Sequence, residues 1–192
     1  AACSGINQII HLAGLAHVVK GSERQAMDTI IQGTHNLLDA AIDAGVGRIV
    51  YLSSSLAEAA ASSEGDVTPY GESKLQAEKL LQSASSEGKI EVVILRAVNV
   101  YGPGMKGNIA SMISLIDRGR WPPLPRLNNK ISLLSVDDLA QALLVALDVR
   151  ETKQRVYTLT DGKQYSIEDI QSAIYRTLDK PMASWRTPRM VL

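Results

Sequence analysis

Short apolar runs alternate along the first half of the chain with segments whose apolar residues recur at helical spacing. The apolar runs are 8–14 (QIIHLAG), 47–55 (GRIVYLSSS) and 91–98 (EVVILRAV), and each has the length and continuity of a buried strand. The segments between them, 22–45 and 70–86, place their apolar residues on one helical face. Buried strands alternating with helices predict a parallel sheet covered by helices.

The second half of the chain is less regular. Its pattern predicts a turn at 101–104 (YGPG), a helix over 108–118, a Pro-rich connection at 121–125, a short strand at 131–135, a helix opening at Ser135, a strand and turn at 155–162, and a closing helix at 166–179. Both of the last two helices open with Ser-x-x-Asp, which is typical of a capping box. We therefore expect a Rossmann-like α/β core to about residue 105, followed by a smaller mixed α/β segment.

Composition and charge narrow the range of partners. The 20 basic and 20 acidic residues cancel, so neither nucleic acid nor an anionic membrane surface is expected as a partner. The single cysteine, Cys3, forms no internal disulfide and suits the reducing cytoplasm, where we place the protein. The three histidines have no ligand-like companions, so no metal site is predicted. No apolar run approaches the roughly 20 residues of a membrane span.

Polar and small residues follow each predicted strand at the edge where open α/β sheets bind ligands. The first strand ends in His11, Leu12, Ala13 and Gly14, where small side chains let a flat cofactor approach the backbone. The second ends in a run of three serines, 53–55, and the third runs into Asn99. The helix that begins near Tyr70 follows the second strand after a loop of modest length, so it can face the same edge.

Tyr70 and Lys74 are four residues apart and therefore share one face of their predicted helix. A free tyrosine has a pKa of roughly 10, and a nearby lysine cation is expected to lower it. With a serine hydroxyl to hold the substrate oxygen, the set suits removal of a proton from an alcohol while hydride leaves its carbon. The same spacing also occurs by chance on amphipathic surfaces. The joint order of these residues at successive strand ends favours the functional interpretation.

These motifs resemble the extended short-chain dehydrogenase/reductases, in the NAD-dependent nucleotide-sugar epimerase/dehydratase branch. The residues that carry the resemblance are HLAG (11–14), GTHNLL (33–38), VYLSSS (50–55), YGESK (70–74) and LRAVNVYGPG (95–104). The resemblance implies that residues 1–105 are the C-terminal half of an NAD-binding core. Residues 106–192 would then be mainly a substrate-binding segment, with parts that return to the core.

The resemblance also implies roles for individual residues. Tyr70 is the implied catalytic acid/base, Lys74 its cationic partner and a ligand of the nicotinamide ribose, and Ser54 the third catalytic residue, with Ser55 as its rival. The implied cofactor is NAD, with NADP left open, bound by Leu12, Ala13, Gly14, Ser53, Tyr70, Lys74, Ala97 and Val98. The implied substrate ligands are Ser54, Ser55, Asn99, Asn108 and Lys130.

The implied reaction is epimerisation of a nucleotide-activated or lipid-diphosphate-linked sugar, at C4, through a transient ketone. A reductase or dehydratase using the same residues is an alternative. Ser55 and Leu56 stand where dehydratases of the family carry an acidic pair, which argues against dehydration. A non-catalytic dinucleotide-binding relative is the third alternative.

Three features depart from the family pattern. Ile30 and Ile131 replace an asparagine and an arginine of the family, and Lys130 can replace that arginine only as a point charge. The glycine-rich loop of the family does not precede HLAG. Without the strand that follows such a loop, 8–14 would have an unpaired edge, so we expect the sequence to be part of a longer polypeptide.

Relatives of this family dimerise through two helices per subunit, which implies a homodimer through about 22–45 and 70–88. Ala77, Leu81 and Ala84 form a stripe suited to that contact, although the same stripe could instead pack on the sheet.

Overall fold

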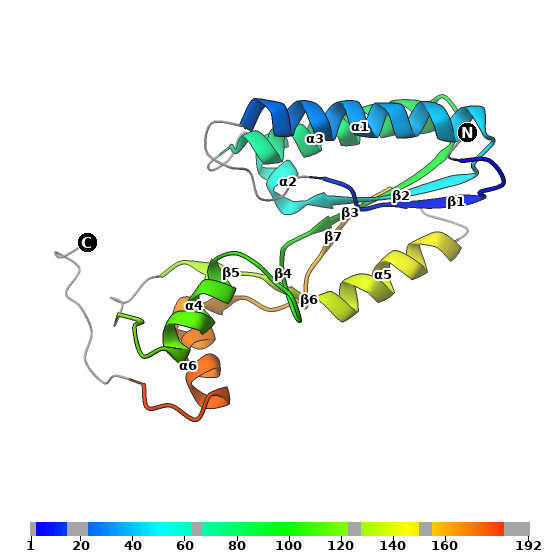
Figure 1. Ribbon diagram of the computed structural model, residues 1–192. Coiled ribbons are helices and arrows are strands. Elements are labelled where there is room, and N and C mark those ends of the chain that lie inside the picture. The colour runs from blue at the N-terminus through cyan, green and yellow to red at the C-terminus, as the bar shows by residue number, and fades with distance from the viewer. Residues whose placement is uncertain (1–2, 15–22, 63–66, 123–127, 150–154, 183–192) are drawn as a thin grey trace. The chain divides into compact units, whose positions relative to one another are not determined.

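The computed structural model describes residues 3–14, 23–62, 67–122, 128–149 and 155–182 (Figure 1). The chain divides into two compact units. Unit 1 comprises Ala1–Val98 and Asp138–Leu159, and unit 2 comprises Asn99–Asp137 and Thr160–Leu192. Unit 1 is therefore assembled from two separate stretches of chain. The functional assignment of residues 1–105 and 106–192 stays a prediction.

A four-stranded parallel sheet forms the centre of unit 1, as the alternating pattern predicted. Its order is β1 (Gln8–His11), β2 (Arg48–Ser54), β3 (Glu91–Ala97) and β7 (Val156–Leu159). The two central strands are buried along most of their length, which explains their continuous apolar sequence. Within the described sheet, β1 is an edge strand that pairs with β2 alone.

Helices α1 (Glu23–Asp43) and α3 (Pro69–Ser86) lie side by side over one face of this sheet (Figure 1). Thr68 caps α3 by accepting a hydrogen bond from the Gly71 backbone N–H at 3.0 Å, and Pro69 fits the first helical turn. Ala77, Leu81 and Ala84 are buried in the core with residues of α1, β2 and β3. The stripe considered for a dimer contact thus packs inside unit 1, and a homodimer through these helices stays a prediction.

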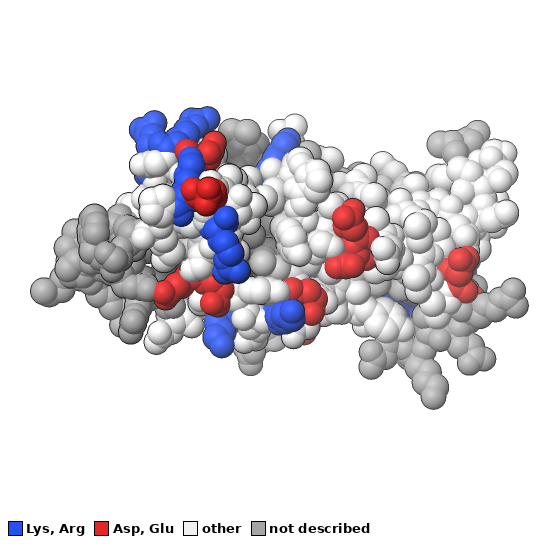
Figure 2. All heavy atoms as spheres, turned by 90° about the horizontal axis from the view of Figure 1, so that it is seen from below, with Lys and Arg blue, Asp and Glu red and all other residues white. Residues whose placement is uncertain are grey.

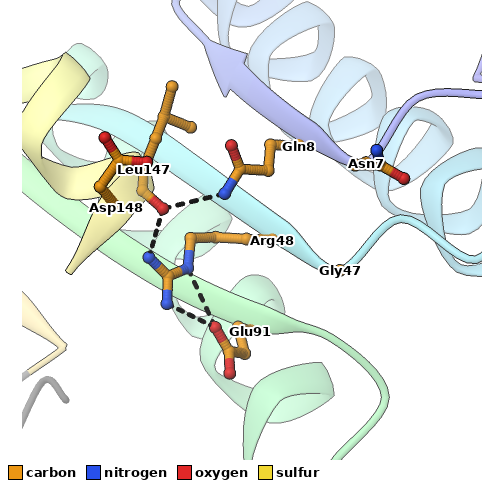
Figure 3. Close-up of a pocket in the computed structure, with 7 residues that line it drawn as sticks. All are labelled: Asn7, Gln8, Gly47, Arg48, Glu91, Leu147 and Asp148. Atoms are coloured by element: carbon orange, nitrogen blue, oxygen red, sulfur yellow. Dashed lines mark hydrogen bonds and ion pairs between the residues drawn. The ribbon is translucent and has the colours of Figure 1, made fainter. Parts of the chain in front are cut away.

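Helix α5 (Val136–Asp148) lies on the other side of the sheet, and its last turn is held by Arg48 at the start of β2. Figure 3 shows the Arg48 guanidinium between the end of α5 and Glu91 of β3. It donates to the carbonyl oxygens of Ala146 and Leu147 at 3.1 and 2.6 Å, and to the Glu91 carboxylate at 2.6 and 3.0 Å. A cation at this position satisfies carbonyl groups that a helix end leaves without partners.

The described residues of unit 2 form two small sheets and two helices. Strand β4 (Asn99–Tyr101) pairs in parallel with β6 (Leu133–Ser135), and β5 (Lys130–Ile131) pairs in antiparallel with β8 (Tyr165–Ser166). Helices α4 (Asn108–Asp117) and α6 (Ile167–Thr177) share a buried cluster of Met112, Ile116, Ile170 and Ile174. The capping box predicted at Ser166 and Asp169 is confirmed.

The sequence pattern did not predict α2 (Ser55–Ser62), β4 or β8, and the single strand predicted at 131–135 is divided into β5 and β6, which belong to different sheets. In the described residues, no helix combines the length and the apolar character needed to cross a bilayer. On the face drawn in Figure 2, lysine and arginine side chains lie among aspartate and glutamate side chains rather than in a broad area of one sign. This mixture agrees with the balanced charge of the sequence.

Candidate active site

The carboxyl ends of β1, β2 and β3 bring the predicted serine and cofactor positions to one edge of the sheet. Ser54 at the end of β2 is in register with Ala97 at the end of β3, and His11 at the end of β1 is in register with Tyr51. Helix α2 begins immediately after Ser54, whose hydroxyl accepts a hydrogen bond from the Leu56 N–H at 3.2 Å. This bond fixes the Ser54 side chain at the strand end.

Lys74 reaches the same edge from α3 and is only 2% exposed. Its ammonium donates to the Leu52 carbonyl oxygen at 2.9 Å and lies 4.6 Å from the centroid of the Tyr51 ring. The Tyr70 ring centroid is 5.9 Å from the same nitrogen. A Cβ added to Gly14 would lie 3.2 Å from it, so the backbone after β1 passes directly beside Lys74. The structure therefore brings Gly14, Tyr70 and Lys74 together.

Burial governs the ionisation of both helix residues. It lowers the pKa of Lys74 to about 8, and the charge of Glu78 opposes this change. Burial raises the pKa of Tyr70. The expectation that Lys74 lowers the pKa of Tyr70 is therefore wrong for this structure, because loss of water around the phenol outweighs any effect of the ammonium, whose hydrogen bond goes to Leu52.

His11 is a buried member of this cluster to which sequence analysis gave no role. Its Nε2 forms a 3.0 Å hydrogen bond with the Thr34 hydroxyl, and its ring centroid lies 5.2 Å from that of Tyr51. Burial, followed by the nearby charge of Lys74, lowers the pKa of His11 to about 4. His11 is therefore neutral at ordinary pH and adds no positive charge beside Lys74.

Glu78 is a second buried residue to which sequence analysis gave no role. It is 1% exposed and accepts hydrogen bonds from Ser53 and Arg96. Helical spacing could have indicated its burial, because residue 78 lies three residues from both Leu75 and Leu81 and shares their buried face of α3. The Ser53 hydroxyl therefore points to Glu78 in the core. Its role at the cofactor stays a prediction, and a contact there would be made by the Ser53 backbone.

The segment after β1 suits the approach of a flat cofactor. Leu12, Ala13 and Gly14 are exposed, and the Gly14 backbone lies beside the Lys74 ammonium where any larger side chain would intervene. Ala97 is buried at the neighbouring strand end and Val98 is half-buried. The residues present therefore fit the predicted group.

The predicted substrate residues of unit 2 occupy three separate places within that unit. Asn99 is exposed in β4, and its side-chain amide donates to the Ser132 carbonyl oxygen at 3.4 Å. Asn108 is the exposed first residue of α4, and Lys130 is exposed in β5. Their roles, and that of Ser55 at the start of α2, stay predictions.

The two isoleucines that depart from the family pattern serve packing. Ile30 is 3% exposed in the core of unit 1, and Ile131 packs against the core of unit 2. Neither side chain can donate a hydrogen bond, so any ligand contact at these positions would be apolar.

The chain is similar to several known proteins. The model of the NAD dependent epimerase/dehydratase family matches residues 1–160. A UDP-glucose 4-epimerase from Vibrio cholerae is 32% identical over 195 residues, which cover 94% of this chain and 59% of that protein. A dTDP-D-glucose 4,6-dehydratase from Mus musculus is 33% identical over 203 residues, covering 97% of this chain and 56% of that protein.

A solved structure of MoeE5 in complex with UDP-glucose and NAD matches with a TM-score of 0.76 and 26% identity. The match covers 91% of this chain and 63% of MoeE5. The chain thus spans less than two thirds of the length of each of these three proteins.

Proposed function

The chain belongs to the NAD dependent epimerase/dehydratase family, and from this premise we propose that it forms part of an NAD-dependent 4-epimerase of a nucleotide-activated sugar. The observation that carries the proposal is the gathering of Gly14, Tyr70 and Lys74 beside the ends of the parallel strands. The likeness to the Vibrio cholerae 4-epimerase supports it.

When bound, NAD would accept a hydride from the sugar carbon and later return it. Tyr70 takes the proton of the sugar hydroxyl as that hydride leaves, so the carbon becomes a ketone. Ser54 hydrogen-bonds the same sugar oxygen and holds it within reach of the phenol. Lys74 places a positive charge near the phenol when Tyr70 loses its proton to become a phenolate. Tyr70 would later give the proton back to the sugar oxygen, and hydride supplied to the opposite face of the ketone would invert the carbon.

The test uses the protein that carries this sequence, with NAD and a panel of UDP-, dTDP- and lipid-diphosphate-linked sugars. Proton NMR of the products is expected to show interconversion of C4 epimers. Tyr70→Phe is expected to abolish turnover while nucleotide binding, followed by calorimetry, remains. Unchanged turnover in Tyr70→Phe would contradict the proposal, and nucleotide binding with no turnover in the parent would favour a non-catalytic relative.

Dehydration is the second candidate, because the Mus musculus relative is a 4,6-dehydratase. Loss of water from a dTDP-sugar, detected by mass spectrometry, would identify it. Ser55 and the partly exposed Leu56 bear no carboxyl group, so we expect epimerisation without this loss.

A homodimer and a cytoplasmic location accompany this proposal as predictions. The stripe of Ala77, Leu81 and Ala84 lends the dimer no support, because it is buried within one chain. Light scattering coupled to gel filtration would measure the mass in solution.

A further inference from the structure

Glu78 is a carboxylate buried at the meeting point of three elements. Its Oε1 accepts from the Ser53 hydroxyl of β2 at 2.5 Å and from Nε of Arg96 of β3 at 3.0 Å. Its Oε2 accepts from Nη2 of Arg96 at 2.7 Å, which completes a two-bond contact between guanidinium and carboxylate. The carboxylate therefore links α3 to the carboxyl-terminal parts of both central strands by hydrogen bonds.

The position of Glu78 relates it to the candidate active site. Tyr70, Lys74 and Glu78 follow one another at intervals of four residues and lie on one face of α3. Ser53 precedes Ser54, and Arg96 precedes Ala97, so both partners of Glu78 adjoin residues assigned to the site. The Glu78–Arg96 pair therefore lies directly beside the candidate active site.

The groups that face Lys74 differ in charge. From β1, His11 is neutral because burial lowers its pKa to about 4. From β2 come the Tyr51 ring and the Leu52 carbonyl oxygen, and from α3 itself the Tyr70 ring. Arg96 of β3 is bound to both oxygens of the Glu78 carboxylate. Among the described residues, Glu78 is the side chain whose negative charge favours the cationic form of Lys74.

We propose that Glu78 is a positioning residue, which keeps Lys74 cationic and holds the Ser54 and Ala97 strand ends against α3. The proposal deepens the proposed function, because a cationic Lys74 is what the proton transfer at Tyr70 requires. Arg96 has a supporting part: its two hydrogen bonds allow an anionic carboxylate to remain buried.

A titration of Lys74 in the full chain, without cofactor or sugar, tests the proposal. The chain is labelled with ¹³C at lysine Cε, the Lys74 signal is assigned with Lys74→Arg, and its midpoint is followed between neutral and alkaline pH. In the parent the midpoint is expected near 8. In Glu78→Gln, which keeps the shape and removes the charge, it is expected to fall by about one pH unit or more. An unchanged midpoint in Glu78→Gln would overturn the proposal.

Two controls separate charge from packing. Glu78→Asp retains the negative charge, so its Lys74 midpoint is expected to lie closer to the parent than to Glu78→Gln. Ser53→Ala removes one hydrogen bond to Glu78 without changing any charge, and it is expected to leave the Lys74 midpoint in place. Equal shifts in Ser53→Ala and Glu78→Gln would show that packing, not charge, sets the midpoint.

Glu78→Gln leaves Arg96 without its anionic partner and so risks a failure to fold. The double variant Glu78→Gln/Arg96→Gln removes both charges and is titrated beside Arg96→Gln, which removes the cation alone. A lower Lys74 midpoint in the double variant than in Arg96→Gln supports the proposal, and equal midpoints overturn it.

The titration does not depend on catalysis, so a failure of the proposed function leaves its result readable. If the sugar is converted, cationic Lys74 is required and turnover falls as pH rises through the Lys74 pKa. The alkaline limb of the pH profile of kcat is then expected at lower pH in Glu78→Gln than in the parent.

Discussion

The ammonium of Lys74 donates a hydrogen bond of 2.9 Å to the carbonyl oxygen of Leu52. This bond joins α3 to β2 two residues before Ser54, so the residue that is to act as a cation also sets the distance between helix and strand end. The charge and the hydrogen bond of Lys74 have opposite effects on the free energy of folding. The buried cation disfavours the folded state, and the hydrogen bond favours it.

Replacing Lys74 with methionine is expected to stabilise the fold at pH 7 while it abolishes turnover. Burial lowers the pKa of Lys74 from 10.5 to about 8, so the protonated form costs about 3 kcal/mol. Loss of the bond to Leu52 offsets about 1 kcal/mol of this gain. We expect a net increase of about 2 kcal/mol in the free energy of unfolding, measured with urea.

The pH dependence of the free energy of unfolding tests whether the charge of Lys74 causes this effect. The unfolded chain binds more protons at Lys74 than the folded chain between pH 8 and 10.5, so the parent gains stability across that range. Tyr51 and Tyr70, whose pKa values burial raises, act in the opposite sense above pH 10. The difference between parent and Lys74→Met therefore isolates Lys74 and should shrink from pH 8 to 10. A constant difference would contradict the assignment.

His11 is expected to make the fold sensitive to mild acid. Burial and the Lys74 charge lower the pKa of His11 from 6.5 to about 4. The associated stability is present above pH 6.5 and is lost as pH falls through 4, by about 3 kcal/mol. Urea unfolding across this range should show a smaller loss in His11→Gln than in the parent. His35→Gln, a change at an exposed histidine of α1, is measured alongside as the matched control.

Gly71 is expected to tolerate no side chain. A Cβ at this position would lie 2.5 Å from the Leu56 carbonyl oxygen, so α2 or the start of α3 must move. We expect Gly71→Ala to destabilise the fold by about 1–3 kcal/mol and to reduce turnover through the displaced Tyr70. Gly33→Ala is the matched control: that glycine lies in α1 with no atom near its Cβ, and the change should stabilise by up to about 1 kcal/mol.

Arg48 is expected to matter more than its acidic partner. In Arg48→Met the carbonyl groups of Ala146 and Leu147 lose their donor inside the protein, and we expect a loss of about 2–4 kcal/mol. Hydrogen exchange should accelerate in the last turn of α5. The Glu91 carboxylate is 66% exposed, so Glu91→Gln should cost less than about 1 kcal/mol. Equal losses in the two variants would contradict this account.

The strands of unit 1 could be predicted because burial on both faces leaves continuous apolar runs, as in β2 and β3. The end of β1 at His11 could not, since Leu12 and Ala13 are apolar but exposed. Helix α2 was missed because its first residue, Ser55, ends a run of serines, which is typical of a loop. The Ser54 hydroxyl accepts a hydrogen bond from the Leu56 N–H at its start.

The positions of Tyr70 and Lys74 on one helical face could be predicted from their spacing, but their ionisation could not. It depends on the depth of burial, which spacing does not give. The burial of Glu78 depends on Arg96, eighteen residues later in the chain and on another element. Pairings of this kind arise from tertiary contacts and leave little local trace in the sequence.

The division of unit 1 into two stretches has a consequence for biosynthesis. On a ribosome, residues 1–98 emerge well before residues 138–159, which supply β7 and most of α5. Until then the nascent chain exposes the free side of β3 and leaves the Arg48 guanidinium without the carbonyl groups of α5. Unit 1 can therefore be completed only after residues 99–137 of unit 2 have been translated. During that interval the exposed strand edge gives the nascent chain its greatest need of chaperones.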